Sequence, residues 1–232
     1  MQPLILQYYQ LLPESRTEDE SEDWARSFRK ALAKFRRSVE ARYLESTLER
    51  LLFSQNSDVR QAAVLALGLN GSYQVNEAVA CCLHDEDLTV RQMAAEALWS
   101  IWQRADTAEN VAELQRLVRL VQADKDPVEI QAGFDALIRK APRYAEAFNQ
   151  RAIFHFQYGD YAKSVADCDK ALRLNPYHFG AANGMGQCFM KQKKLRAALR
   201  SFRRALRINP NLENVRESIQ SLERMLGEEG KK

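Results

Sequence analysis

Glycine and proline are scarce in this sequence. The 232 residues include nine glycines and six prolines. A many-stranded sheet needs turn residues at intervals of about eight to twelve residues, so this scarcity argues against an all-β fold. The 46% of apolar residues can still form a sizeable core, and together with 28% of charged residues they suit amphipathic helices. We therefore predict an almost entirely helical protein.

The four cysteines form no Cys-x-x-Cys pair, and their spacing is not that of a zinc site or of a small disulfide-rich domain. We interpret Cys81, Cys82, Cys168 and Cys188 as buried free thiols in a reducing compartment. The three histidines are far apart in the sequence. We therefore expect no metal site and no cofactor.

Long apolar runs are also missing. No stretch approaches the roughly 20 apolar residues that span a membrane. Residues 1–15 lack the basic start of a secretory signal peptide. These absences lead us to expect a cytoplasmic protein with no membrane partner.

Common catalytic signatures are absent as well. The sequence has no G-x-x-x-x-G-K-[ST] phosphate loop, no G-x-G-x-x-G, no H-E-x-x-H and no G-x-S-x-G. Because these signatures are missing, we predict a protein that is not an enzyme.

The net charge of +3, from 34 basic and 31 acidic residues, is too small to indicate a nucleic-acid partner.

The sequence does contain an internal repeat. The stretch "DKALRLNPY" (169–177) is followed 34 residues later by "RRALRINPN" (203–211). A period of this length indicates stacked helix pairs. Residues 145–176 and 179–210 resemble the tetratricopeptide family, which has small residues where two helices approach closely and a proline after the second helix. The matching positions are Phe148, Ala152, Ser164, Cys168, Ala171, Pro176, Ala182, Met185, Gly186, Phe189, Ala198, Phe202 and Pro210.

A second type of repeat comes earlier in the chain. The stretches "SDVRQAAVLALGLNG" (57–71) and "LTVRQMAAEALWSIW" (88–102) share V-R-Q-x-A at a spacing of 31 residues. They resemble the short bacterial type of HEAT repeat. We expect Asp85 and Asp87 to cap the helix that follows them. The resemblance implies that Arg60 and Arg91 join a ladder of polar contacts between neighbouring repeats.

The resemblances imply an all-α superhelix in which HEAT-like repeats run continuously into tetratricopeptide repeats. Each clear array has only two units, and about three are needed for stability, so we expect the arrays to stack as one solenoid. We predict an N-terminal docking segment with an acidic linker (1–23), a helix and two HEAT-like repeats (24–104), a degenerate junction repeat readable as either type (105–142), two tetratricopeptide repeats with a capping helix (143–226) and a tail (227–232).

Repeats of the tetratricopeptide type bind partners along a concave groove lined by the first helix of each pair. We therefore expect a non-enzymatic scaffold or adaptor that binds a protein or an extended, partly acidic peptide. Asparagine can pair with a peptide backbone, apolar side chains can form a pocket, and cations can hold carboxylates. The groove positions are Arg116, Arg119, Asn149, Gln150, Ile153, Phe156, Asn183, Gln187, Met190 and Lys191.

Two alternatives remain open on sequence grounds. Short HEAT arrays also occur in bilin lyases and related chaperone-like assembly factors, and this resemblance covers only residues 45–104. The basic runs "WARSFRKALAKFRR" (24–37) and "KQKKLRAALRSFRRALR" (191–207) could bind phosphate backbones. Their aromatic residues belong to the apolar stripes, however, so a solvated helix face is the preferred interpretation of both runs.

Overall fold

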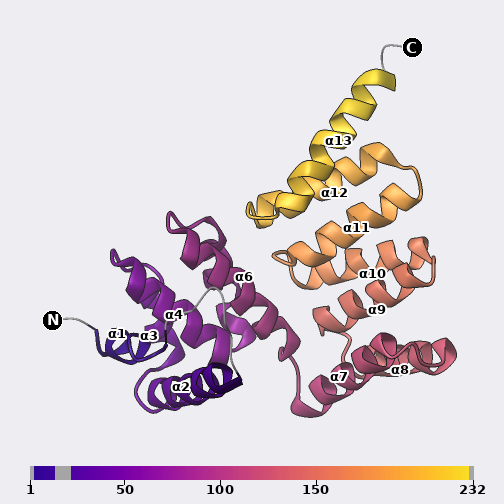
Figure 1. Ribbon diagram of the computed structural model, residues 1–232. Helices are drawn as coiled ribbons and strands as arrows, with labels where there is room; N and C mark the ends of the chain where they lie inside the picture. The colour runs from indigo at the N-terminus through magenta and orange to yellow at the C-terminus, as the bar shows by residue number, and fades with distance from the viewer. Residues whose placement is uncertain (1–2, 14–21, 230–232) are drawn as a thin grey trace. The chain divides into compact units, whose positions relative to one another are not determined.

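The computed structural model describes residues 3–13 and 22–229. Within these ranges every regular element is an α-helix or a short 3-10 helix, and none is a β-strand, which confirms the predicted all-α class (Figure 1). Most of the acidic linker and the last residues of the tail lie outside the described residues. The chain divides into two compact units, which we call unit 1 (residues 1–101) and unit 2 (residues 102–232).

Unit 1 contains the helix pairs of the two predicted HEAT-like repeats, α3 with α4 and then α5 with α6, preceded by two further helices. α3 packs against α4. Both α1 and α2 pack against α4. Ile5 and Leu6 of α1 are buried, and the Ile5 N–H donates a hydrogen bond to the Tyr43 hydroxyl. The helices are α1 (Leu4–Tyr9), α2 (Glu22–Glu40), α3 (Glu45–Leu51), α4 (Ser57–Asn70), η1 (Tyr73–Val75), α5 (Asn76–Cys81), η2 (Cys82–His84) and α6 (Leu88–Gln103), whose last two residues belong to unit 2.

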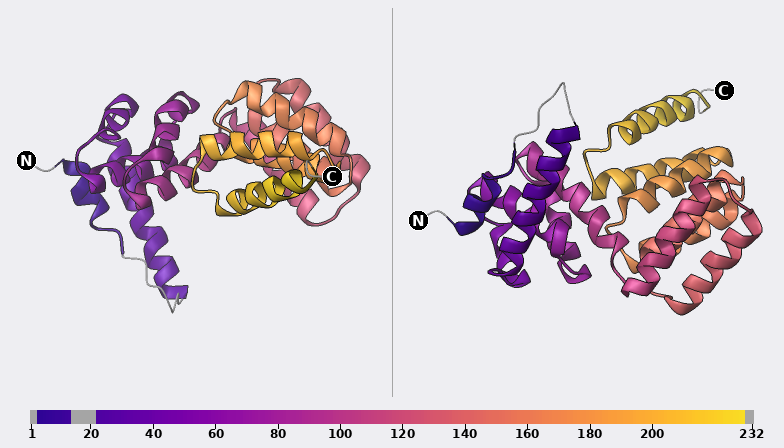
Figure 2. Two further views of the ribbon diagram at one scale, coloured as in Figure 1. Left: turned by 90° about the horizontal axis from the view of Figure 1, so that it is seen from above. Right: turned by 60° about the horizontal axis from the view of Figure 1, so that its bottom comes forward.

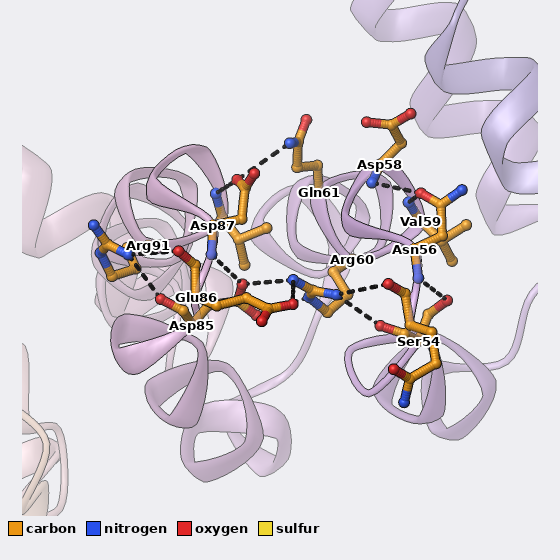
Figure 3. A network of polar contacts seen from close by, with 12 residues as sticks. Ser54, Asn56, Asp58, Val59, Arg60, Gln61, Asp85, Glu86, Asp87 and Arg91 are labelled. Atoms are coloured by element: carbon orange, nitrogen blue, oxygen red, sulfur yellow. Dashed lines mark hydrogen bonds and ion pairs between the residues drawn. The ribbon is translucent and has the colours of Figure 1, made fainter.

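Arg60 joins the two helix pairs of unit 1 (Figure 3). Its Nε and Nη2 each donate to one oxygen of the Asp85 carboxylate, both at 2.8 Å. Its Nη1 donates to the carbonyl oxygens of Ser54 and Gln55. The side chains of Arg60 and Asp85 are only 7% and 10% exposed. The turn before α4 is therefore fixed to the turn before α6, which is the inter-repeat contact that the resemblance implies.

The turn before α6 is organised by two aspartates with different roles. The Asp87 carboxylate caps α6 by accepting the Val90 N–H, at 2.9 Å, as predicted. Asp85 does not cap α6, because its carboxylate accepts from Arg60 and from the Asp87 N–H instead. Burial raises the pKa of Asp85, but the Arg60 and Asp87 hydrogen bonds lower it more, so this pKa lies below its ordinary value. Arg91 donates to the carbonyl oxygens of Asp85 and Glu86, which repeats the backbone contacts of Arg60 one pair later.

Unit 2 is a row of helices in which each member from α9 to α13 packs against the next (Figures 1 and 2). α7 pairs with α8, and α8 contacts α9. One apolar cluster surrounds Phe134 and Tyr144, and a second surrounds Ala171 and Phe202. The helices are α7 (Ala108–Gln122), α8 (Pro127–Lys140), α9 (Ala145–Gln157), α10 (Tyr161–Leu174), α11 (Phe179–Lys191), α12 (Leu195–Ile208) and α13 (Glu213–Glu229).

Gly186 lets α11 approach α12 closely. A Cβ added at Gly186 would lie 2.4 Å from Cε1 and 2.5 Å from Cδ1 of Phe202, whose side chain is 1% exposed and closely packed. Gly186→Ala is expected to lower the free energy of unfolding by about 1–3 kcal/mol through overpacking, measured by urea denaturation. Gly227→Ala is the control, because an added Cβ there meets nothing within 4 Å. An equal loss in both variants would contradict the packing argument.

Candidate partner-binding face

The ten residues predicted to bind a partner lie on the first helix of three successive pairs in unit 2. Arg116 and Arg119 are on α7, and the others are divided equally between α9 and α11. α9 and α11 contact each other. We call the positions on these two helices the candidate face, which consists of Asn149, Gln150, Ile153, Phe156, Asn183, Gln187, Met190 and Lys191.

Exposure varies along the candidate face. Ile153 is 42% exposed, which is high for an aliphatic side chain in the middle of a packed helix. Gln187 and Lys191 are also exposed. Asn149 is only 3% exposed. The partly exposed members are Gln150, Phe156, Asn183 and Met190. The accessible part of the face is therefore an aliphatic and aromatic centre with a polar border.

Asn149 and Asn183 are equivalent in the 34-residue repeat but differ in their surroundings. The Asn149 Nδ2 donates to Glu146 Oε1 at 3.3 Å. The position equivalent to Glu146 is Gly180, so the second repeat offers no such carboxylate. The Asn183 Oδ1 is buried, with no hydrogen-bond partner among the residues that the structure describes. The Asn149 amide already donates a hydrogen bond to Glu146, whereas the Asn183 oxygen is unsatisfied within the described part of the chain. That a peptide binds both asparagines in the same way stays a prediction.

Glu146 organises the polar contacts beneath the candidate face. Its side chain is fully buried, and its carboxylate also accepts from Gln150 Nε2 at 2.6 Å. The His178 Nε2 lies 2.9 Å from Glu146 Oε2. Because His178 Nδ1 accepts the Ala181 N–H and thereby caps α11, the ring proton is on Nε2 and points at the carboxylate. Glu146 thus ties the first turn of α9 to the first turn of α11.

Aromatic side chains close this polar centre. The Trp102 ring stacks on the His178 ring, with centroids 4.3 Å apart and an angle of 23° between the planes. Trp102 is 1% exposed and also contacts Phe179. The Tyr144 hydroxyl donates to the Gln103 carbonyl, which holds the end of α6 to the start of α9. Water is thereby excluded from Glu146 and His178.

The side of α9 that faces α8 and α10 carries a second ionic network. Arg151 donates two hydrogen bonds to Asp167 of α10, at 2.8 and 2.7 Å, and one to Asp135 of α8, at 2.6 Å. Burial lowers the pKa of His155, which lies beside Asp167. Arg151 therefore binds three helices together at a position where tetratricopeptide repeats commonly have an aliphatic residue.

The predicted cations are not equally available to a partner. Arg116 forms a two-point ion pair with Glu113, with both contacts at 2.9 Å, and also approaches Glu129. Arg119 and Lys191 are exposed and form no ion pair with any residue that the structure describes. Of the three predicted carboxylate-binding residues, these two therefore keep an uncompensated charge.

The cysteines are free thiols, and three of the four are buried. Cys81 is exposed, contrary to the prediction that all four are buried. Burial raises the pKa of Cys82 and of Cys168 to about 12, so neither forms a thiolate near neutral pH.

Within the described ranges no group of three or more His, Cys, Asp or Glu residues could hold a metal ion. No helix in these ranges is long and apolar enough to cross a membrane.

Comparison with known families identifies both repeat types. Residues 44–138 match the model of HEAT repeats, and residues 145–178 and 181–212 match the model of the tetratricopeptide repeat. The HEAT match extends through most of the stretch that the sequence left open to either type. That stretch nevertheless packs in unit 2, with the tetratricopeptide repeats.

Curated relatives are similar over part of their length. A TPR repeat-containing protein of Rhizobium etli is 28% identical over 121 residues, which are 52% of this chain and 59% of that protein. The human Protein SGT1 homolog is 34% identical over 79 residues, 34% of this chain and 22% of that protein. A solved structure, the first TPR of Spaghetti (RPAP3) bound to the HSP90 peptide SRMEEVD, is 19% identical with a TM-score of 0.49, and the match covers 53% of this chain and 96% of that one.

Proposed function

We propose that this chain, in which HEAT repeats at residues 44–138 precede tetratricopeptide repeats at residues 145–178 and 181–212, is a protein-binding scaffold with no catalytic activity of its own. Stacked helix pairs offer long, ordered surfaces on which a partner can lie. The candidate face on α9 and α11 is where we place an extended segment of that partner.

The main support for this proposal is the exposed apolar centre of the candidate face. Ile153 is 42% exposed on α9, Phe156 follows it one turn later, and Met190 of α11 is the repeat equivalent of Phe156. These three side chains offer apolar surface to a partner, and methionine adapts its shape to different side chains. Ile153 is held at the surface because the opposite side of α9 is fixed by the hydrogen bonds from Arg151 to Asp167.

Charge favours a segment with acidic character. Lys191, at the end of α11, and Arg119, on α7, are the cations among the predicted residues that no described carboxylate neutralises. Each can form a charge-assisted hydrogen bond with a carboxylate of the partner. Arg116 is already paired with Glu113, so we do not assign it to contact with the partner.

A paired variant tests the candidate face. Ile153→Asp with Met190→Asp places two carboxylates in the apolar centre, and it is expected to reduce at least fivefold the amount of partner recovered by affinity capture from native extract. The matched control is Leu44→Asp with Leu88→Asp, which makes the same chemical change at leucines of unit 1 that are 75% and 54% exposed. The control should retain every partner. Recovery of the same partners by both variants would show that the candidate face is not the binding site.

A further inference from the structure

A strongly basic surface of unit 2 lies on α12 and the turn before it. The stretch from Lys170 to Leu212 contains no aspartate and no glutamate. Arg196, Arg200 and Arg204 follow one another at intervals of four residues and therefore lie along one side of α12. All three are exposed.

Most of these charges are not neutralised by any side chain that the structure describes. Among the side chains that the structure describes, only one arginine of α12 is paired across to α13: Arg203, whose Nη2 lies 2.7 Å from Glu223 Oε1. The cations that form no ion pair with a described residue are Lys193, Lys194, Arg196, Arg200, Arg204 and Arg207. Like charges this close repel one another, so an anionic partner would be stabilised here.

A hollow accompanies the charges. It has a volume of about 540 Å³ and lies between the start of α12 and the last turns of α13. Its apolar lining comes from Leu195, Ala197 and Leu226, and its charged lining comes from Lys193, Lys194, Arg196 and Arg200. No described carboxylate lines it. The hollow thus combines an aliphatic floor with a cationic rim.

We propose that this hollow, which we call the cationic hollow, binds an acidic segment of a partner protein that inserts an aliphatic side chain between Leu195 and Leu226. Carboxylates on either side of that side chain would pair with Lys193, Arg196 and Arg200. The cationic hollow shares no residue with the candidate face on α9 and α11, so its occupation is independent of the proposed function.

The lining favours a protein segment over a nucleic acid. Single-stranded nucleic acids are held by aromatic side chains on which the bases stack, and the hollow contains no aromatic residue. An aliphatic floor gives a phosphate backbone nothing to bind, whereas it can bury a leucine side chain of a protein segment. The cationic rim then selects segments in which that side chain is flanked by carboxylates.

The test uses the 232-residue chain and a fluorescein-labelled synthetic peptide with one leucine between two runs of glutamate, and binding is followed by fluorescence anisotropy. Lys193→Glu with Arg196→Glu and Arg200→Glu is expected to raise the Kd at least tenfold. The matched control is Lys30→Glu with Lys34→Glu and Arg37→Glu on α2, which changes the net charge equally at three exposed cations without described ion pairs. The control should change the Kd less than twofold. Circular dichroism shows that each variant is folded.

Three outcomes would overturn the proposal. An equal loss of affinity in both triple variants would show that overall charge, rather than the cationic hollow, attracts the peptide. A peptide with serine in place of leucine is expected to bind at least threefold more weakly, and unchanged binding would remove the role of the aliphatic floor. Tighter binding of an oligonucleotide than of the peptide, lost in the α12 variant alone, would assign the surface to nucleic acid instead.

Discussion

Replacement of Glu146 by alanine is expected to lower the free energy of unfolding of unit 2 by about 2–6 kcal/mol, since each of two buried donors, on Asn149 and His178, loses its acceptor at a cost of about 1–3 kcal/mol. Glu146 is 0% exposed, and its carboxylate accepts from Asn149, Gln150 and His178. Alanine would leave these buried donors without an acceptor, and an unsatisfied buried polar group is costly. A loss of this size is a large fraction of the stability of a typical domain.

The measurement is hydrogen exchange followed by mass spectrometry, because it reports unit 2 separately from unit 1. Faster exchange is expected first in the opening turn of α11, whose Ala181 N–H depends on His178. The matched control is Glu109→Ala, which removes a glutamate that is 79% exposed and paired with Lys140 at 2.6 Å. Its cost should not exceed about 1 kcal/mol. A Glu146→Ala protein within 1 kcal/mol of the native chain would refute the structural role of the carboxylate.

Arg60→Ala is expected to cost unit 1 a similar amount, about 3–5 kcal/mol, because it leaves the nearly buried Asp85 carboxylate without its guanidinium partner. The carbonyl oxygens of Ser54 and Gln55 also lose their donor. Glu86→Ala is the control within the same network. Glu86 lies 3.3 Å from Arg60 but is 86% exposed, so its removal should cost less than about 1 kcal/mol.

Two further measurements separate the contribution of the Arg60–Asp85 ion pair to stability from the contribution of its surroundings. The double variant Arg60→Met with Asp85→Leu should lose less unfolding free energy than Arg60→Ala, because it leaves no buried charge unpaired. Urea denaturation of Arg60→Met, of Asp85→Leu and of the double variant gives the coupling energy between the two side chains. Since the folded pKa of Asp85 is lowered, its stabilisation is complete above the unfolded value of about 3.9 and is lost as the pH falls below it. A coupling energy near zero would contradict the assignment of Arg60 as the inter-repeat contact.

The sequence predicted the helical class and both repeat types because these depend on periodic, local patterns. Small residues such as Gly186 mark close helix contacts, and the V-R-Q-x-A stretches mark the HEAT turns. The spacing of repeats also placed Arg60 correctly, since its partner lies in the equivalent turn of the next pair. Stacking of the two arrays into one solenoid stays a prediction.

The environment of the candidate face was less predictable. Asn149 and Asn183 occupy equivalent positions, and their different surroundings follow from residues elsewhere in each repeat. The buried Asn149 amide donates to Glu146. In an alignment of the repeats, Glu146 looks like any glutamate in the first turn of a helix. The signal that could have found this centre is a paired difference, in which Glu146 and His178 of the first repeat correspond to Gly180 and Leu212 of the second.

That paired difference restricts how these repeats could be rearranged by recombination. Glu146 and His178 lie near opposite ends of one repeat, and both are replaced together in the next. A crossover inside the repeat would inherit one partner without the other, and would bury either an unmatched carboxylate or an unmatched imidazole. A crossover directly after His178 would keep both. The buried contact therefore makes the whole 34-residue unit, rather than a single helix, the smallest segment that could be duplicated or exchanged without loss of stability.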